Sequence, residues 1–333
     1  MKLASTPKDT VHREGTARLY RFRPVHEGRA EAGPPVFLVP SVINRWYVLD
    51  LRPGASVAEA LVAAGFDVFC LDWGAPEDED RYLEWETLFR RLGRAWRVAQ
   101  RLSGQKRMGL LGYCMGATVA GIFAAQHPDE VAAFVNLAGP FDFSKAGFLG
   151  EMTDPRWFDA EVVAAAGNIS PIQMQSGFTT LRPTQNLAKW MGVIDRWPDA
   201  PSMDAFQALE SWANDNIAFP AAAYVRYIQD LYQKNELIQG RHWVNGQRVE
   251  LTAITCPVLT VTADRDNICP VSAASALNDH VGSAVRELLV IPGGHVGAVV
   301  GSKAPKLLYP MLARWFGPGS SYPLAVRSPT AQA

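Results

Sequence analysis

The sequence predicts an α/β protein with a mainly parallel β-sheet, helices on both faces of the sheet, and an inserted, mostly helical cap. Short apolar runs that are typical of buried strands alternate with helical segments over the first part of the chain. This alternation stops at about residue 143 and returns after residue 247. Of the 333 residues, 48% are hydrophobic, so the chain can bury a large core and wholesale disorder is excluded.

The first part of the chain contains most of the predicted sheet. One strand is expected at 17–22, within an otherwise polar N-terminal stretch. Each later apolar run is bounded by turn residues and followed by a helical pattern, so right-handed crossovers should make neighbouring strands parallel. The expected buried strands are 35–40, 66–71, 108–111 and 131–137, and the expected helices are 56–64, 85–101 and 117–125.

The middle of the chain, residues 143–247, is rich in Trp, Met, Gln and Asn and contains no convincing buried strand. We interpret it as a cap or lid inserted between strands, not as a new domain. The core then resumes with expected strands at 257–262 and 287–291 and expected helices at 273–277 and 303–316. The predicted parts are a first core part (1–142), the cap (143–247), a second core part (248–316) and a disordered tail (317–333).

Charge and composition exclude several classes of protein. Lys and Arg number 32 and Asp and Glu 33, and this balance argues against a basic surface for nucleic acid. No apolar run reaches the roughly 20 residues of a membrane helix, and the N-terminus lacks the apolar core of a signal peptide. We therefore expect a cytoplasmic protein without a membrane span. The six histidines and four cysteines show no zinc-site spacing, so neither a metal nor a cofactor is expected.

The most informative motif is Gly112–Gly116 (GYCMG), which lies between a buried strand and an apolar helix. It matches the G-x-nucleophile-x-G elbow of α/β-hydrolases, with Cys114 in place of serine. The glycines keep side chains out of a strained turn, and the N-terminus of the following helix favours a thiolate and a developing oxyanion. The motif therefore predicts an α/β-hydrolase fold in which Cys114 is the nucleophile.

A nucleophile of this kind needs a histidine that is oriented by an acid. In this fold the acid and then the histidine follow the nucleophile along the chain. His295 comes directly after the last predicted strand and is the histidine at the expected position. Asp264 and Asp266 both follow the preceding strand, and spacing alone does not choose between them. The other aspartate is expected to cap a helix or to pair with Arg265.

The oxyanion should be held by two backbone N–H groups. One is that of Met115, which follows the nucleophile, and the other comes from near Val42, in a loop that can also be read as a simple turn. Trp73, Trp212 and Tyr232 are candidates for the lining of an apolar acyl pocket, and the alternative is that each is an ordinary core residue.

Beyond these motifs, the chain resembles the polyhydroxyalkanoate (PHA) synthases, especially the catalytic subunit of the two-subunit class III and IV enzymes. The resemblance extends from about residue 35 to residue 316 and depends on several long motifs in the same order. These are 42–51 (VINRWYVLDL), 67–74 (DVFCLDWG), 112–116 (GYCMG), 227–237 (YIQDLYQKNEL), 246–259 (GQRVELTAITCPVL) and 295–303.

The resemblance implies that Cys114 is the nucleophile, His295 the general base, and Asp266, not Asp264, the acid. It implies (R)-3-hydroxyacyl-CoA as substrate, a growing polyester as product and coenzyme A as leaving group, with no separate cofactor. It also implies a homodimer, a second helical subunit and a location at the polyester granule surface.

Two positions depart from the family pattern. Asn267 stands where the family commonly has histidine, which affects the candidate substrate pocket or the geometry of the acid. Ala117 stands where the family usually has a second glycine after the motif, and it crowds the elbow.

The predicted function is therefore an acyltransferase that polymerises hydroxyacyl units through an acyl-Cys114 intermediate. The alternative is a cysteine-dependent α/β-hydrolase or thioesterase that acts on acyl-CoA or hydroxyacyl esters, in which water and not an alcohol reaches the intermediate. A third class, a non-catalytic granule-associated or partner-binding relative, is disfavoured by the complete triad. The preferred acyl-chain length does not follow from the sequence.

Overall fold

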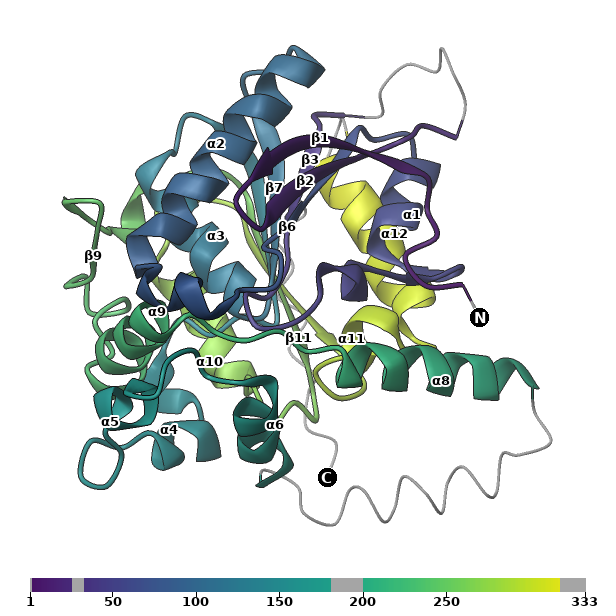
Figure 1. The fold of residues 1–333 in the computed structure, drawn as a ribbon. Helices are drawn as coiled ribbons and strands as arrows, with labels where there is room; N and C mark the ends of the chain where they lie inside the picture. The colour runs from purple at the N-terminus through teal and green to yellow at the C-terminus, as the bar shows by residue number, and fades with distance from the viewer. Residues whose placement is uncertain (1, 26–32, 181–199, 318–333) are drawn as a thin grey trace, which may run out of the picture.

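The computed structural model describes residues 2–25, 33–180 and 200–317. Figure 1 shows a central twisted sheet with helices packed on both of its faces. The sheet has eight strands, and β2 is antiparallel to both of its neighbours, whereas the strands from β6 to β12 are parallel. The prediction of a mainly parallel sheet is thus confirmed. In spatial order the strands are β1 (Lys8–Glu14), β2 (Ala17–Phe22), β6 (Val68–Asp72), β3 (Val36–Val39), β7 (Met108–Tyr113), β8 (Val131–Leu137), β11 (Val258–Ala263) and β12 (Arg286–Ile291).

Helices of the core cover the two faces of the sheet. In Figure 1, α2 and α3 lie on one face, and α1 and α12 lie on the other. The core helices are α1 (Val57–Ala63), α2 (Trp85–Ser103), α3 (Met115–Gln126), α10 (Val271–His280), α11 (Gly297–Val300) and α12 (Ala304–Phe316). Four short 3-10 helices are η1 (Trp46–Leu49), η2 (Asp78–Tyr82), η3 (Phe143–Lys145) and η5 (Leu251–Ala253).

The central strand β3 shows why the buried strands read as continuous apolar runs. All four of its residues are fully buried, because the sheet is covered on both faces. Val36 and Leu38 pack into the core that contains α1 and α12, whereas Phe37 and Val39 pack into the core that contains α2 and α3. The Phe37 ring lies 5.4 Å from that of Trp96 on α2.

Helical elements occupy most of the described chain between β8 and β11. In Figure 1, α4, α5, α6 and α9 gather at one end of the sheet. These elements are α4 (Phe148–Met152), α5 (Ala160–Ala164), α6 (Pro171–Thr180), α8 (Ala200–Asn214), α9 (Ala221–Arg226) and a π-helix, η4 (Tyr227–Gln233). Two short hairpins are formed by β4 (Asp50–Arg52) with β5 (Ala55–Ser56), and by β9 (Trp243–Val244) with β10 (Gln247–Arg248). We keep the name cap for residues 143–247.

Several features differ from, or lie beyond, what was expected, among them the two short hairpins. The edge strand β1 was not predicted, because most of its side chains are polar and none is fully buried. The short helix α11, directly after His295, was not predicted either. The predicted tail from residue 318 onward, and residues 181–199 of the cap, lie outside the described residues.

Across the parts of the chain that the structure describes, no helix combines the length and the apolar character that crossing a membrane requires.

Candidate active site

Cys114, Asp266 and His295 lie at one edge of the sheet. They follow the carboxyl ends of β7, β11 and β12, respectively. Since these strands are parallel, their carboxyl ends share an edge, where the loops of α/β proteins form sites. The fold therefore brings together residues that are as much as 181 positions apart in the chain.

Cys114 occupies a strained turn between β7 and α3. Its φ of 56° and ψ of -129° belong to a region that residues with a side chain rarely adopt. The Cys114 N–H donates to the Leu137 carbonyl on β8 at 2.9 Å, and its carbonyl accepts from the Ala117 N–H at 2.9 Å. These bonds hold the side chain at the start of α3, where it is partly exposed.

The glycines of the elbow are required by close backbone packing. A Cβ on Gly116 would lie 2.2 Å from the Pro40 carbonyl oxygen, and a Cβ on Gly112 would lie 2.3 Å from the Ala117 Cα. Ala117 itself fits because its neighbour across the turn is Gly139, whose own Cβ would come within 2.4 Å of the Ala117 Cβ. The departure at Ala117 is thus accommodated by Gly139.

Asp266 is the aspartate that contacts the histidine. Its Oδ2 lies 2.7 Å from His295 Nδ1, and both side chains are nearly fully buried. Its Oδ1 accepts hydrogen bonds from the Ile268 and Cys269 N–H groups, each at 2.9 Å. The carboxylate is therefore fixed by its own loop and orients the imidazole with the remaining oxygen.

Asp264 points elsewhere. It is exposed, its Oδ1 accepts from the Gly293 N–H at 2.8 Å, and it forms an ion pair with Arg265 at 3.5 Å. Asp264 thus binds the backbone of the loop that precedes His295, whereas the ring itself is bound by Asp266.

The imidazole of His295 interacts with the Cys114 side chain and with the Asp266 carboxylate. Burial by itself would lower the pKa of His295, but negative charge on the Cys114 sulfur and the hydrogen bond to Asp266 raise it from 6.5 to about 10. The second nitrogen, Nε2, is buried, and an interaction of the ring with the Cys114 side chain contributes to the raised pKa. Nε2 is therefore the ring atom available to exchange a proton with Cys114 or with a substrate.

Cys114 opens into a cavity between the core and the cap. The cavity has a volume of about 320 Å³, within the range of small-molecule sites. Most of its lining is apolar and comes from the cap, including Leu149, Met152, Phe158 and Phe219. An acyl chain attached to the Cys114 sulfur would be held among these side chains.

The two predicted oxyanion donors come from the start of α3 and from the 41–45 loop. Met115 is the first residue of α3 and lines the cavity. Its N–H therefore lies at the N-terminus of the helix, where the partial positive charge of the helix dipole favours an oxyanion. On the other loop, Ile43 lines the cavity, whereas Val42 does not and packs into the core.

Of the predicted pocket residues, only Tyr232 lines the cavity. Asn267 is exposed, although the next residue, Ile268, lines the cavity. Trp73 and Trp212 are core residues: the Trp73 indole donates to the Pro40 carbonyl at 3.0 Å, and that of Trp212 donates to the Arg45 carbonyl at 2.9 Å.

These two tryptophans therefore do not form the pocket. They hold the two ends of the 41–45 loop, from which the second oxyanion donor is predicted to come.

Cys269 and Tyr227 are among the cavity residues that the sequence analysis did not single out. Cys269 is buried and lines the cavity, and burial raises the pKa of its thiol well above the ordinary value. The sequence feature that could have predicted it is its position, three residues after the predicted acid Asp266. Tyr227 lines the cavity because a π-helix presents it, and that irregularity has no clear sequence signature.

The comparisons with known proteins agree first on the class of fold. A family model described as "alpha/beta hydrolase fold" matches residues 34–302. The structure also superimposes on a monoglyceride lipase from Saccharomyces cerevisiae (TM-score 0.59, 13% identity, 93% of this chain and 95% of that one). It superimposes equally on a hydrolase from Pseudomonas aeruginosa (TM-score 0.58, 15% identity, 94% and 100%). The fold is therefore that of the α/β-hydrolases.

Sequence relatives define the family within this class. A model described as "Poly-beta-hydroxybutyrate polymerase (PhaC) N-terminus" matches residues 1–61. The chain is 32% identical to a poly(3-hydroxyalkanoate) polymerase subunit PhaC from Allochromatium vinosum, over 93% of this chain and 88% of the relative. It is 31% identical to that from Synechocystis sp., over 95% and 85%. The chain belongs to the family of poly(3-hydroxyalkanoate) polymerase PhaC subunits, which are acyltransferase-type enzymes. The predicted resemblance is thus confirmed.

We expect Gly116→Ala to destabilise the elbow. Its methyl group would collide with backbone and not with a flexible side chain, so the free energy of unfolding should fall by about 2 kcal/mol or more. Chemical denaturation would measure this. Gly297→Ala is the control, because nothing lies within 4 Å of the added methyl group, and it should change stability by less than about 0.5 kcal/mol. Equal stability of both variants would contradict the packing argument.

The imidazole of His295 should lose its high pKa when Cys114 is replaced. In an NMR titration of the ring protons, we expect the wild-type transition near pH 10. In Cys114→Ala, removal of the neighbouring negative charge should lower the pKa by at least about one unit. Cys256→Ala, a buried cysteine in another part of the core, should leave the titration unchanged. An unaltered transition in Cys114→Ala would show that the two groups do not interact.

Proposed function

We propose that this protein polymerises (R)-3-hydroxyacyl-CoA into polyhydroxyalkanoate, with release of coenzyme A, through a covalent intermediate on Cys114. The observation that supports this most is that the fold brings Cys114, which lines an apolar cavity, to the same sheet edge as the buried His295–Asp266 pair, whose facing atoms lie 2.7 Å apart. The PhaC family to which the chain belongs supplies the reaction class. The proposed chemistry uses side chains of this chain and needs no metal or additional cofactor.

In the first half-reaction, Cys114 takes the acyl group from coenzyme A. The Cys114 thiolate attacks the thioester carbonyl, and the Met115 N–H stabilises the oxyanion that forms. The carbon–sulfur bond to coenzyme A then breaks, and the proton of the His295 imidazolium passes to the departing sulfur. The products are acyl-Cys114, free coenzyme A and a neutral imidazole. Because one thioester replaces another, this step is close to isoenergetic.

In the second half-reaction, the imidazole acts as a base. With the sulfur acylated, the negative charge that held the proton on His295 is gone, so the ring can accept one. It takes the proton of the hydroxyl group of another hydroxyacyl unit, and the alkoxide attacks the acyl-Cys114 carbonyl. An ester bond forms, the Cys114 thiolate leaves, and the imidazolium–thiolate pair is restored for the next cycle.

The cap has the role of limiting water. Water and the alcohol would compete for the same acyl-Cys114, and only the alcohol extends the polymer. The apolar cap residues that line the cavity disfavour a water molecule close to the thioester. A cysteine-dependent hydrolase or thioesterase is the outcome if water prevails.

Assembly and location follow from the family and the product. The relatives are named as subunits, which supports a second, helical subunit as partner. We propose that the protein forms a homodimer and acts at the surface of the polyester granule, since the growing chain is insoluble.

Replacement of the nucleophile tests the intermediate. Incubation with 3-hydroxybutyryl-CoA should give an acyl adduct on Cys114 that intact-protein mass spectrometry detects. Cys114→Ala should give no adduct, and its rate of coenzyme A release should fall at least about 10³-fold. Circular dichroism should show that its fold is intact. Cys114→Ser should keep the shape of the site but release coenzyme A far more slowly. Substantial release by Cys114→Ala would refute the role of this residue.

The nature of the product separates polymerisation from hydrolysis. The purified protein, with and without a candidate partner subunit, should convert 3-hydroxybutyryl-CoA into insoluble polyester and coenzyme A. Chromatography of the depolymerised pellet and of the supernatant measures polymer and free hydroxy acid separately. Free 3-hydroxybutyrate as the main product under both conditions would establish the hydrolase alternative.

A further inference from the structure

The wall of the cavity that the cap contributes contains a π-helix, η4. A π-helix is rare and is found frequently at functional sites. Its wide turn brings residues five positions apart to the same side, and here these are Tyr227 and Tyr232. Their rings lie 5.6 Å apart, and both line the cavity together with Cys114. A regular α-helix would separate the two tyrosines on its surface.

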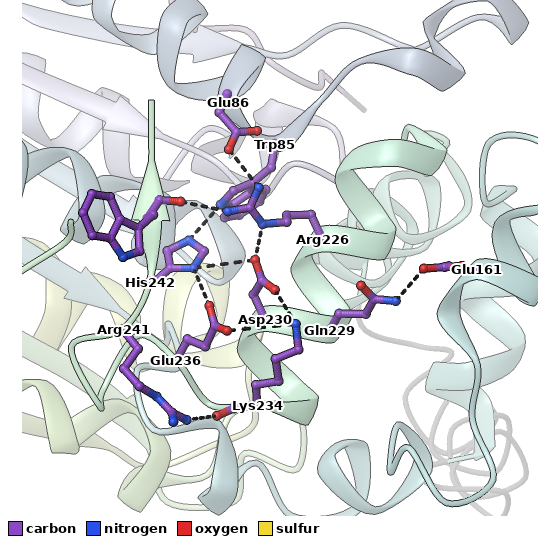
Figure 2. Close-up of polar contacts among 11 residues, drawn as sticks. Trp85, Glu86, Glu161, Arg226, Gln229, Asp230, Lys234, Glu236, Arg241 and His242 are labelled. Atoms are coloured by element: carbon purple, nitrogen blue, oxygen red, sulfur yellow. Dashed lines mark hydrogen bonds and ion pairs between the residues drawn. The ribbon is translucent and has the colours of Figure 1, made fainter. Parts of the chain in front are cut away.

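The opposite side of η4 is clamped by ion pairs. Asp230 is buried and binds Arg226 and Lys234, the latter at 3.2 Å. Arg226 also donates to Glu86 on α2 at 3.0 Å (Figure 2). It donates in addition to the Trp243 carbonyl on β9 at 2.9 Å. The π-helix is thus attached to both the core and the β9–β10 hairpin, which fixes the direction of its tyrosines.

The side chains around Asp230 could also be interpreted as a cation site, but the protonation of His242 argues against it. Asp230, Glu236 and His242 offer donor atoms within 4.8 Å of one another. The Trp85 indole N–H, however, donates to His242 Nε2 at 3.1 Å, so the neutral ring carries its proton on Nδ1, the atom that faces the two carboxylates (Figure 2). Burial lowers the pKa of His242 to about 4, which keeps the ring neutral. The proton occupies the lone pair that a metal would need.

The two tyrosine hydroxyl groups remain protonated and lie near the nucleophile. Burial raises the pKa of each phenol, and negative charge on Cys114 raises both further. For Tyr224, in the same wall, burial alone raises the pKa to about 12. The Tyr227 hydroxyl donates a hydrogen bond to that of Tyr232, so the Tyr232 O–H is the donor left for a ligand in the largely apolar cavity that Cys114 also lines.

Two other polar side chains of the wall form hydrogen bonds with backbone groups. The Thr153 hydroxyl donates to the Leu149 carbonyl at 2.9 Å, and the Gln173 side-chain carbonyl accepts from the Ser170 N–H at 2.8 Å. A buried hydroxyl group gains most from a ligand that supplies a polar partner. The 3-hydroxyl group of an acyl chain on Cys114 is such a partner, because it is only two carbon atoms from the thioester carbonyl.

We propose that Tyr232, positioned by the hydrogen bond from Tyr227, donates to the 3-hydroxyl oxygen of the acyl group on Cys114, and that this pair selects 3-hydroxyacyl over plain acyl thioesters. This inference rests on the proposed function and adds the group that recognises the substrate. A site that hydrogen-bonds a substrate hydroxyl discriminates strongly against the analogue that lacks it, since its own polar groups are then left unpaired. The tyrosines thus determine specificity, whereas His295 and Cys114 perform the transfer.

The test compares two thioesters of equal chain length. Acylation of Cys114 by 3-hydroxybutyryl-CoA and by butyryl-CoA is followed in the first turnover, by coenzyme A release and intact-protein mass. In the Tyr227→Phe, Tyr232→Phe double variant, the ratio of kcat/KM for the two substrates should fall about tenfold or more. The loss should lie on the hydroxyacyl substrate alone, because Phe preserves the ring packing. Tyr224→Phe removes a hydroxyl from the same wall and should leave the ratio unchanged.

Each outcome decides between separate claims. An unchanged ratio in the double variant, or an equal loss on both substrates, overturns the selection of the 3-hydroxyl group. If the double variant unfolds, the single variants Tyr227→Phe and Tyr232→Phe are compared in the same way. Acylation by butyryl-CoA shows that each variant is folded. If wild-type protein takes an acyl group at Cys114 from neither thioester, the proposed function itself fails. Acylation that is normal but independent of the hydroxyl groups removes only the present inference.

Discussion

The site depends on the electrostatic interaction between the Cys114 sulfur and the His295 imidazole. Negative charge on the sulfur and the hydrogen bond to the Asp266 carboxylate raise the pKa of His295 against the cost of burying a cation. The same interaction explains how one ring can serve two steps. In the proposed mechanism the ring is an acid before acylation and can protonate a departing thiolate, and after acylation the charge that held its proton has disappeared. The state of the sulfur thus sets the role of the histidine.

This interaction requires a precisely placed sulfur, and the backbone provides it at a cost. Cys114 has a strained conformation that its hydrogen bond to Leu137 and the packing of Gly116 on Pro40 compensate. The parallel strands β7, β11 and β12 supply the common edge. Trp73 and Trp212 extend the same support, because each fixes one carbonyl of the loop that faces the elbow. A large part of the core therefore serves to position one atom.

The sequence predicts the sheet and the elbow well because both have strong local signals. Strands that are buried on both faces appear as continuous apolar runs, and the elbow needs glycines. The choice between Asp264 and Asp266 did not follow from spacing, since it depends on which carboxylate the Ile268 and Cys269 N–H groups bind. Strand β1 lacks an apolar face, and Tyr227 reaches the cavity only through a π-helix. Both depend on tertiary contacts that no residue pattern records.

The fold does not by itself decide between synthesis and hydrolysis, because lipases with 13–16% identity share it. The charge relationship in the core would serve either reaction, since it prepares an acyl-cysteine without specifying what attacks it. In the proposed mechanism that choice belongs to the cap, which supplies the apolar wall and the two tyrosine hydroxyls. A wall that disfavours water but offers donors to a hydroxyacyl chain lowers the concentration of one nucleophile while it orients the chain that carries the other. The hydrogen bond from Arg226 to Glu86 attaches this wall to α2 and so fixes its position relative to the Cys114 sulfur. In this mechanism a change in the cap can therefore alter the product without altering the triad.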